Sequence, residues 1–252
     1  VIDTGVLEAP AFAADVSREE VASAGGASLS DLVDQKDRGA AMAVMGQGAA
    51  AVLKRLHESG MIDGVTSMGG GGGTSVATTA MRALPVGFPK LMVSTVASGD
   101  TSGFIGTSDI LMMPSVIDVN GVNRISRQIY SNAAGAICGM AQGEAAVAGD
   151  DKLLIAATMF GNTTRAVNHA KSLLEAADYE VLVFHATGTG GRTMEALIAD
   201  GHIAGVLDMT TTEWADEICG GVLSAGSDRL SAAANAGVPQ VVVPGCIDMC
   251  NF

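Results

Sequence analysis

Basic residues are scarce in this chain. It has 14 lysines and arginines against 27 acidic residues, a formal net charge of −13 over 252 residues. No run of basic residues offsets this charge, so the phosphate backbone of a nucleic acid would be repelled on average, which argues against a nucleic-acid partner. A small anion remains compatible, because backbone N–H groups and a few arginines can outweigh the mean field locally.

Long apolar runs are also missing. No stretch of about 18 apolar residues occurs, which argues against a membrane span. The first residues do not read as a charged, then apolar, then small-residue leader, so we expect no secretory signal and a cytoplasmic protein.

Val1 to Asp3 reads like the tail of a strand, and the apolar run 241–243 lacks a following helix. We therefore expect the sequence to be part of a longer protein.

The common cysteine motifs are absent as well. The four cysteines are Cys138, Cys219, Cys246 and Cys250. The spacing of the last two is C-x-x-x-C, whereas common zinc and redox motifs have two intervening residues. We expect buried free thiols in a reducing cytosol.

The chain divides into two similar halves. A small, acidic stretch at 145–151 predicts a boundary, with domains at 1–148 and 149–252. Apolar, strand-like runs alternate with helical patterns, which indicates βαβ units and a parallel sheet covered on both faces. We therefore predict an α/β fold with two Rossmann-like domains. The expected strands are 62–68, 90–96, 153–159, 181–186, 203–209 and 240–244. The expected helices begin at the Ser17–Glu20 capping box and cover 42–56, about 74–83, 125–143 and 166–177.

Ligands of open parallel sheets bind beyond the carboxyl ends of the strands. The segments that follow the expected strands here are rich in glycine, serine and threonine. Hydroxyls and bare amides at helix N-termini bind phosphate or carboxylate oxygens. A single such segment can equally be a helix cap, but a series of them favours an anion site.

Two glycine-rich segments stand out. In 69–75 five consecutive glycines let the backbone approach an oxyanion, although a flexible turn is the alternative. The lysine of a Walker A loop is missing and the pattern G-x-G-x-x-G is incomplete, because position 74 is threonine. In 188–193 the glycines precede Arg192, a fixed positive charge for an anion or a plain surface residue. The residues predicted to contact the ligand are Gly69, Gly70, Gly71, Gly72, Gly73, Thr74, Ser75, Ser94, Thr95, Ser98, Gly99, Asp100, Thr187, Gly188, Thr189, Gly190, Gly191 and Arg192.

Charged candidates for catalysis are few. Asp100 and Asp109 lie in the hydroxyl-rich segment 98–109 and could hold Mg²⁺ through water, act as a base, or cap turns. His185 lies at a strand end, where a structural role competes with catalysis. Glu213 could be an acid–base group or a first-turn acid that the helix dipole favours. No catalytic triad follows from spacing alone.

Several segments resemble the Tm-one-like ATP-binding family. They include RALPVGFPKLMVSTVASGDT, VLVFHATGTGGRTMEALI, GVLDMTTTEWADEICGGVLSAG and GVPQVVVPGCIDM. The resemblance covers almost the whole chain. It implies two Rossmann-like domains, ATP binding and self-association, in proteins longer than this chain at both ends.

Three hypotheses follow. The first is a nucleotide-binding protein, with ATP as the ligand, Mg²⁺ as an accompanying ion and no assured catalytic activity. The second is an enzyme that acts on a small phosphorylated or carboxylated metabolite. The third is a structural module whose glycines serve packing only. Small alanine-rich helices and 13 methionines favour a homodimer.

Overall fold

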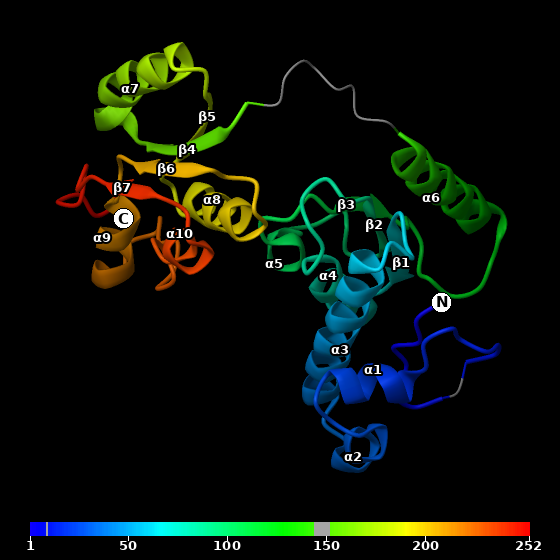
Figure 1. Cartoon of the computed structure of the whole chain (residues 1–252). Coiled ribbons are helices and arrows are strands. Elements are labelled where there is room, and N and C mark those ends of the chain that lie inside the picture. The colour runs from blue at the N-terminus through cyan, green and yellow to red at the C-terminus, as the bar shows by residue number, and fades with distance from the viewer. Residues whose placement is uncertain (9, 144–151) are drawn as a thin grey trace. The chain divides into compact units, whose positions relative to one another are not determined.

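The protein folds into two compact units, Val1–Ala145 and Ala146–Phe252. The computed structural model describes residues 1–8, 10–143 and 152–252 (Figure 1). Each unit has a parallel sheet flanked by helices, so the predicted α/β class with two Rossmann-like domains is confirmed. The predicted boundary between residues 148 and 149 lies outside the described residues.

Unit 1 has a three-stranded parallel sheet in the order β1-β2-β3. The strand β3 follows an expected loop and was not predicted from the sequence. In chain order the elements are α1 (Arg18–Ala24), α2 (Leu29–Gln35), α3 (Arg38–Glu58), β1 (Val65–Gly69), α4 (Gly71–Met81), β2 (Lys90–Ser94), α5 (Ser102–Ile105), β3 (Leu111–Pro114) and α6 (Arg124–Gln142).

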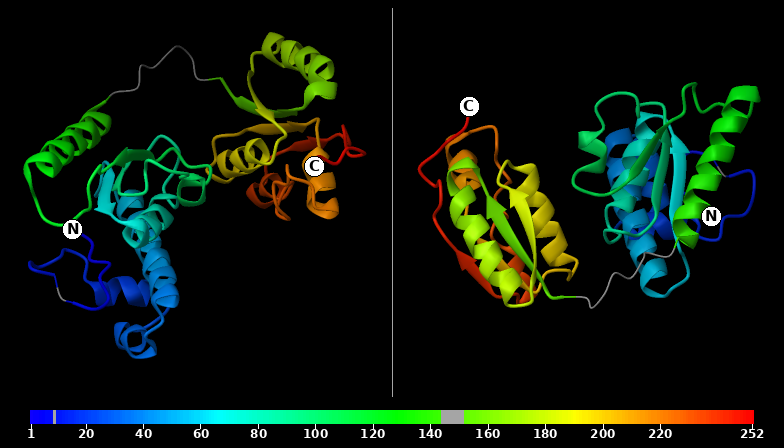
Figure 2. Two further views of the ribbon diagram at one scale, coloured as in Figure 1. Left: turned by 180° about the vertical axis from the view of Figure 1, so that it is seen from behind. Right: turned by 90° about the horizontal axis from the view of Figure 1, so that it is seen from above.

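Helices cover both faces of the unit 1 sheet (Figure 2). Successive side chains of β2 point to opposite faces of the sheet, so both faces need apolar cover. Met92 packs with Met81 of α4 on one face, and Leu91 and Val93 pack with Ala133 of α6 on the other. All five residues of β2 are buried. Each large apolar side chain buried in this way stabilises the fold by about 1.5–3 kcal/mol.

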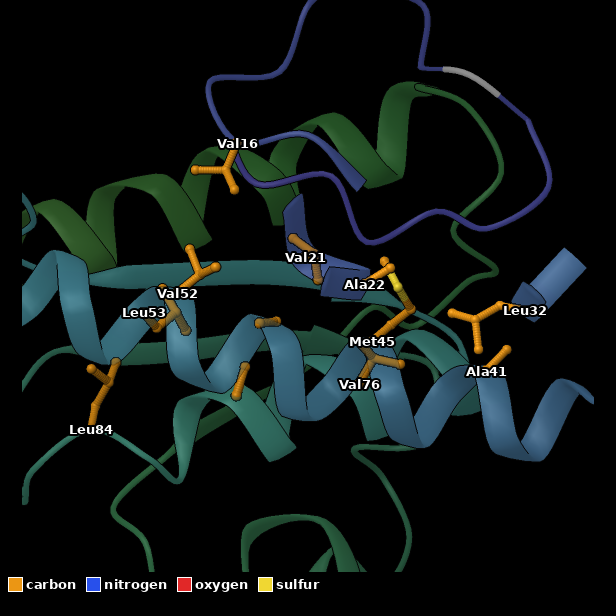
Figure 3. Packing of buried hydrophobic residues seen from close by; sticks show 12 residues of the cluster. Val16, Val21, Ala22, Leu32, Ala41, Met45, Val52, Leu53, Val76 and Leu84 are labelled. Carbon is orange, nitrogen blue, oxygen red and sulfur yellow. The ribbon is translucent and has the colours of Figure 1, made fainter. Parts of the chain in front are cut away.

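The long helix α3 carries the largest apolar cluster of unit 1. Figure 3 shows Val21 and Ala22 of α1 beside Met45 and Val52 of α3, with Val76 of α4 in the same cluster. The two helices α1 and α3 cross closely at glycines. A Cβ atom on Gly48 would lie 1.9 Å from the carbonyl oxygen of Val21. The core therefore fixes α3 and α4 side by side, and their N-terminal ends form part of the site described below.

Unit 2 has a four-stranded parallel sheet in the order β5-β4-β6-β7. Ala156 of β4 faces Met194 and Ile198 of α8, whereas its neighbour Ala157 faces Val167 of α7, so helices cover both faces of this sheet too (Figure 1). The elements are β4 (Leu154–Met159), the 3₁₀ turn Gly161–Thr163, α7 (Thr164–Ala176), β5 (Glu180–His185), α8 (Thr189–Ala199), β6 (Gly205–Asp208), α9 (Thr212–Cys219), α10 (Ala232–Ala236) and β7 (Gln240–Val242).

Two local predictions need correction. Helix α4 begins at Gly71 and not near Thr74, because the glycines themselves form its first turn: the Thr74 N–H donates to the Gly70 carbonyl at 2.8 Å. The low helix propensity of glycine hides this start in the sequence. The cysteines are free, but none is buried as predicted: Cys138 and Cys219 are exposed, and Cys246 and Cys250 are half-buried.

The predicted capping box at the start of α1 is present in part: Ser17 accepts the Glu20 N–H, whereas the Glu20 carboxylate accepts from Arg55 Nη2 at 2.6 Å. Gly143 follows the last residue of α6, as predicted. Among the residues described, no helix is both long and apolar enough to cross a membrane.

Candidate functional site

The first glycine segment is the N-terminal end of α4. Gly70 is the N-cap residue, with extended backbone angles and no side chain to cap the helix. The N–H groups of Gly71, Gly72 and Gly73 precede the first intrahelical hydrogen bond, and within the described residues no side chain accepts them. Free amides at the positive end of a helix dipole form an anion-binding arrangement.

Packing inside unit 1 does not explain why Gly71 and Gly73 lack side chains. A Cβ atom on Gly71 would meet nothing within 4 Å, and one on Gly73 would meet only the Met68 carbonyl oxygen at 3.9 Å. Neither glycine has a positive φ. Since glycine costs about 0.5–1 kcal/mol in a helix relative to alanine, we infer that the open space in front of these amides serves something outside the chain.

A guanidinium group lies beside these amides. Arg38, the first residue of α3, places its Nη2 atom 3.0 Å from the position that a Cβ atom on Gly72 would take. A guanidinium group and helix amides both favour an oxyanion. We call the N–H groups of Gly71, Gly72 and Gly73 together with the Arg38 side chain the α4 amide site. Sequence reasoning missed Arg38, because only the packing of α3 against α4 brings it here.

Two predicted ligand contacts instead position the helix. Thr74 and Ser94 are fully buried, and their hydroxyls share a hydrogen bond of 2.6 Å. The Thr74 hydroxyl also donates to the Gly70 carbonyl at 2.9 Å, and the Ser94 hydroxyl accepts the Val96 N–H at 3.1 Å. These bonds join the end of β2 to the start of α4. The exposed hydroxyl is that of Thr95, 3.6 Å from a Cβ position on Gly70.

The predicted acidic candidates of unit 1 lie in different places. Ser98, Gly99 and Asp100 form an exposed turn after β2. Hydrogen bonds from Ser102 hold the pKa of Asp100 below its ordinary value. Asp109 pairs at 2.7 Å with the ammonium group of the buried Lys90, the first residue of β2. Asp109 therefore lies at the amino end of the strand, away from the α4 amide site.

The second glycine segment is built around an internal carboxylate. The Glu213 Oε1 atom accepts the N–H groups of Gly188 at 2.7 Å and of Gly191 at 3.1 Å. Its Oε2 atom accepts the Nε of Arg229 at 2.7 Å, and the residue is 1% exposed. These two amides are thus engaged by the protein itself, and both oxygens of the buried Glu213 carboxylate accept hydrogen bonds from within the protein.

Backbone conformation or close packing within the protein explains each glycine of this second segment. Gly188 has a φ of +82°. A Cβ atom on Gly190 would lie 1.8 Å from the His185 carbonyl oxygen, and one on Gly191 would lie 2.2 Å from the Glu213 Oε2 atom. Here the packing interpretation of the glycines fits the geometry, in contrast to Gly71 and Gly73.

Arg229 connects this loop to the sheet. Its two Nη atoms donate to the Asp208 carboxylate at 2.6 and 2.7 Å, and Nη1 also donates to Glu195 at 3.0 Å. Burial opposes the charged form of Arg229, but the bonds to Asp208 and Glu213 outweigh it and raise its pKa. One buried guanidinium therefore holds β6, α8 and α9 together.

The remaining predicted residues of unit 2 lie near this loop. His185 is exposed at the end of β5, and Thr187 is exposed. The Arg192 Nη1 donates to the Ser224 carbonyl at 2.8 Å, and its Nη2 lies 3.5 Å from the Thr189 hydroxyl. Binding of a ligand by these residues stays a prediction.

Two large open cavities lie away from the glycines of α4, and Arg192 lines the second of them. One of about 990 Å³ lies beside α1 and α2, and one of about 750 Å³ lies along α8 and α10. Neither is lined by the glycines of α4. An anion at a helix end needs donors more than enclosure, so we keep the α4 amide site as the candidate. Among the residues described, no group of three His, Cys, Asp or Glu side chains is arranged to hold a metal.

Comparison with known proteins finds relatives of one family. The UPF0261 protein of Clostridium tetani is 57% identical over the full chain, and a UPF0261 protein of Rhizobium meliloti is 47% identical. The ToMV resistance protein Tm-1(GCR237) of Solanum lycopersicum is 44% identical over 85% of this chain and 29% of its own length. The chain spans 62% of the length of the two bacterial relatives.

The match extends over both units. Residues 1–146 match the N-terminal domain of the uncharacterised protein family UPF0261, and residues 152–252 match its C-terminal domain. The chain therefore belongs to the UPF0261 family.

Proposed function

We propose that unit 1 binds the phosphate groups of a nucleotide, with ATP as the ligand, at the α4 amide site. The observation that carries the proposal is the set of three free helix amides of Gly71, Gly72 and Gly73, of which Gly71 and Gly73 have room for a side chain that the sequence does not supply. ATP as the ligand follows from the resemblance described above, whereas the geometry supports an oxyanion. Mg²⁺ would accompany the phosphates, and the protein would self-associate as a homodimer in the cytoplasm.

We propose nucleotide binding without assured catalysis, because two of the acidic candidates for catalysis are paired with basic residues of the protein. Glu213 is engaged in a buried ion pair, and Asp109 pairs with Lys90. Asp100 and His185 remain the exposed candidates for an enzyme that acts on a phosphorylated or carboxylated metabolite. Competition of such metabolites with ATP would distinguish this alternative.

Replacing Arg38 with glutamine is expected to weaken ATP binding about tenfold, because a charge-assisted hydrogen bond contributes about 1.5–3 kcal/mol. Isothermal titration calorimetry with ATP, with and without Mg²⁺, measures this change. Arg127→Gln is the matched control, since Arg127 is an exposed arginine on α6. Equal affinities for the two variants, or no heat with the unmodified protein, would contradict the proposal.

A further inference from the structure

The segment 249–251, which follows β7 in the chain, lies along helix α9 (Figure 1). The Thr212 hydroxyl at the start of α9 donates to the Met249 carbonyl at 2.9 Å. One turn further along the helix, the Asp216 carboxylate accepts the Asn251 backbone N–H at 2.6 Å and the Asn251 side-chain amide at 2.8 Å. Asp216 is fully buried, so these hydrogen bonds hold the segment against the helix.

The Cys250 thiol in this segment points at the last turn of α9. Its Sγ atom donates to the Asp216 carboxylate at 3.3 Å and to the Ala215 carbonyl oxygen at 3.8 Å. In an α-helix that carbonyl accepts the N–H of the residue four positions further on, which here is Cys219, the last residue of α9. The Cys250 sulfur therefore lies against the turn that carries the Cys219 side chain.

The two thiols differ in exposure. Both are free, and Cys219 is exposed whereas Cys250 is half-buried. Burial raises the pKa of the Cys250 thiol, and the adjacent Asp216 carboxylate and Cys219 thiol raise it further. Cys250 is therefore a protonated, shielded thiol, while Cys219 is the thiol that a small molecule can reach. An accessible thiol beside a second one is the arrangement of an attacking and a resolving cysteine.

We propose that Cys219 and Cys250 form a redox-modification site, which a low-molecular-weight disulfide such as oxidised glutathione converts to an intramolecular disulfide. The Cys219 thiolate attacks one sulfur of the external disulfide, so that a mixed disulfide forms and one glutathione leaves. The Cys250 sulfur then attacks the Cys219 sulfur and displaces the second glutathione, which takes up the proton of Cys250. The external disulfide is reduced to two glutathione molecules, while the two cysteines lose two electrons and two protons.

The contacts of Cys250 decide which cysteine is its partner. Nearness in the sequence would pair Cys250 with Cys246. Both acceptors of the Cys250 thiol belong to α9, however, which favours Cys219. A disulfide between these two residues would fix the segment 249–251 to α9 by a covalent bond. Because such a cross-link restricts the unfolded chain, oxidation should stabilise unit 2.

Peptide mass spectrometry of the oxidised chain tests this pairing. Trypsin cleaves after Arg229 and no lysine or arginine follows it, so Cys219 and Cys250 end on different peptides, whereas Cys246 and Cys250 share one. The folded chain is treated with oxidised glutathione, its remaining thiols are blocked, and it is denatured and digested. We expect a disulfide-linked pair of these two peptides. The link should persist in Cys246→Ser and be lost in Cys250→Ser and in Cys219→Ser.

The melting temperature of unit 2 gives a second readout. Trp214 on α9 is the single tryptophan of the chain, so its fluorescence follows the unfolding of this unit. Oxidation should raise the melting temperature of the unmodified chain and of Cys246→Ser by about 5 °C or more. It should leave the melting temperature of Cys250→Ser unchanged.

The exposed Cys138 of unit 1 serves as the control for the oxidant. Oxidised glutathione is added until Cys138 carries glutathione. If no linked peptides form under these conditions, the proposal is wrong. A link that persists in Cys250→Ser would identify Cys246 as the partner of Cys219 and would also overturn it. Neither outcome depends on ATP, so this inference and the proposed function fail or stand separately.

Discussion

Replacing Arg229 with methionine is expected to lower the free energy of unfolding of unit 2 by about 3–5 kcal/mol, or to prevent its folding. The substitution would leave the carboxylates of Asp208, Glu213 and Glu195 without their shared cation. Asp208 and Glu213 are at most 1% exposed, so water cannot replace the guanidinium without opening the fold. Urea unfolding followed by circular dichroism measures the change.

Arg192→Met is the matched control for this prediction. Arg192 is exposed, and its side chain donates to the Ser224 carbonyl and lies near the Thr189 hydroxyl. Its replacement should change the free energy of unfolding by less than about 1 kcal/mol. If Arg229→Met were as stable as this control, the central structural role that we assign to Arg229 would be wrong.

Replacing Gly70 with aspartate is expected to reduce ATP affinity about 100-fold or more while the fold remains intact. The extended angles of Gly70 suit an N-cap aspartate. Its carboxylate would accept the N–H groups of Gly72 and Gly73 and add a negative charge near Arg38. Each charged hydrogen bond so displaced contributes about 1.5–3 kcal/mol. Calorimetry gives the affinity, and thermal unfolding gives the stability.

The stability of this variant makes the prediction specific. Aspartate exceeds glycine as an N-cap by only a few tenths of a kcal/mol, so the free energy of unfolding should stay equal or rise slightly. Gly70→Ala, which adds a Cβ atom without a carboxylate, should retain ATP affinity to within a few-fold; the added atom would meet Thr95 Oγ1 at an ordinary 3.6 Å. Unchanged ATP binding in Gly70→Asp would show that the ligand does not use these amides.

The sequence predicted the parallel sheets well, because apolar runs alternate with helical stripes in both units. It did not reveal β3, a four-residue strand that ends at Pro114 and lies among hydroxyl-rich turns. It also placed the start of α4 too late, since glycine normally argues against a helix. The amphipathic pattern of α6 is strong, and its end at Gly143 was predicted correctly.

The two glycine segments show why a site is harder to predict than a fold. Both look like anion-binding loops in the sequence. In the folded protein, however, Glu213 accepts the amides of Gly188 and Gly191, while those of Gly71 to Gly73 remain free. Glu213 lies more than 20 residues along the chain from Gly188 and Gly191, whose amides it accepts. Arg38 lies beside Gly72 only because helix α3 packs against helix α4. No local pattern encodes either contact.

Glycine-selective ¹⁵N labelling with an ATP titration tests the α4 amide site most directly. We predict that the amide signals of Gly71, Gly72 and Gly73 shift on addition of ATP, while those of Gly188 and Gly191, held by Glu213, stay in place. Unshifted signals for Gly71 to Gly73 at ATP concentrations that saturate binding would contradict the assignment of the phosphates to α4.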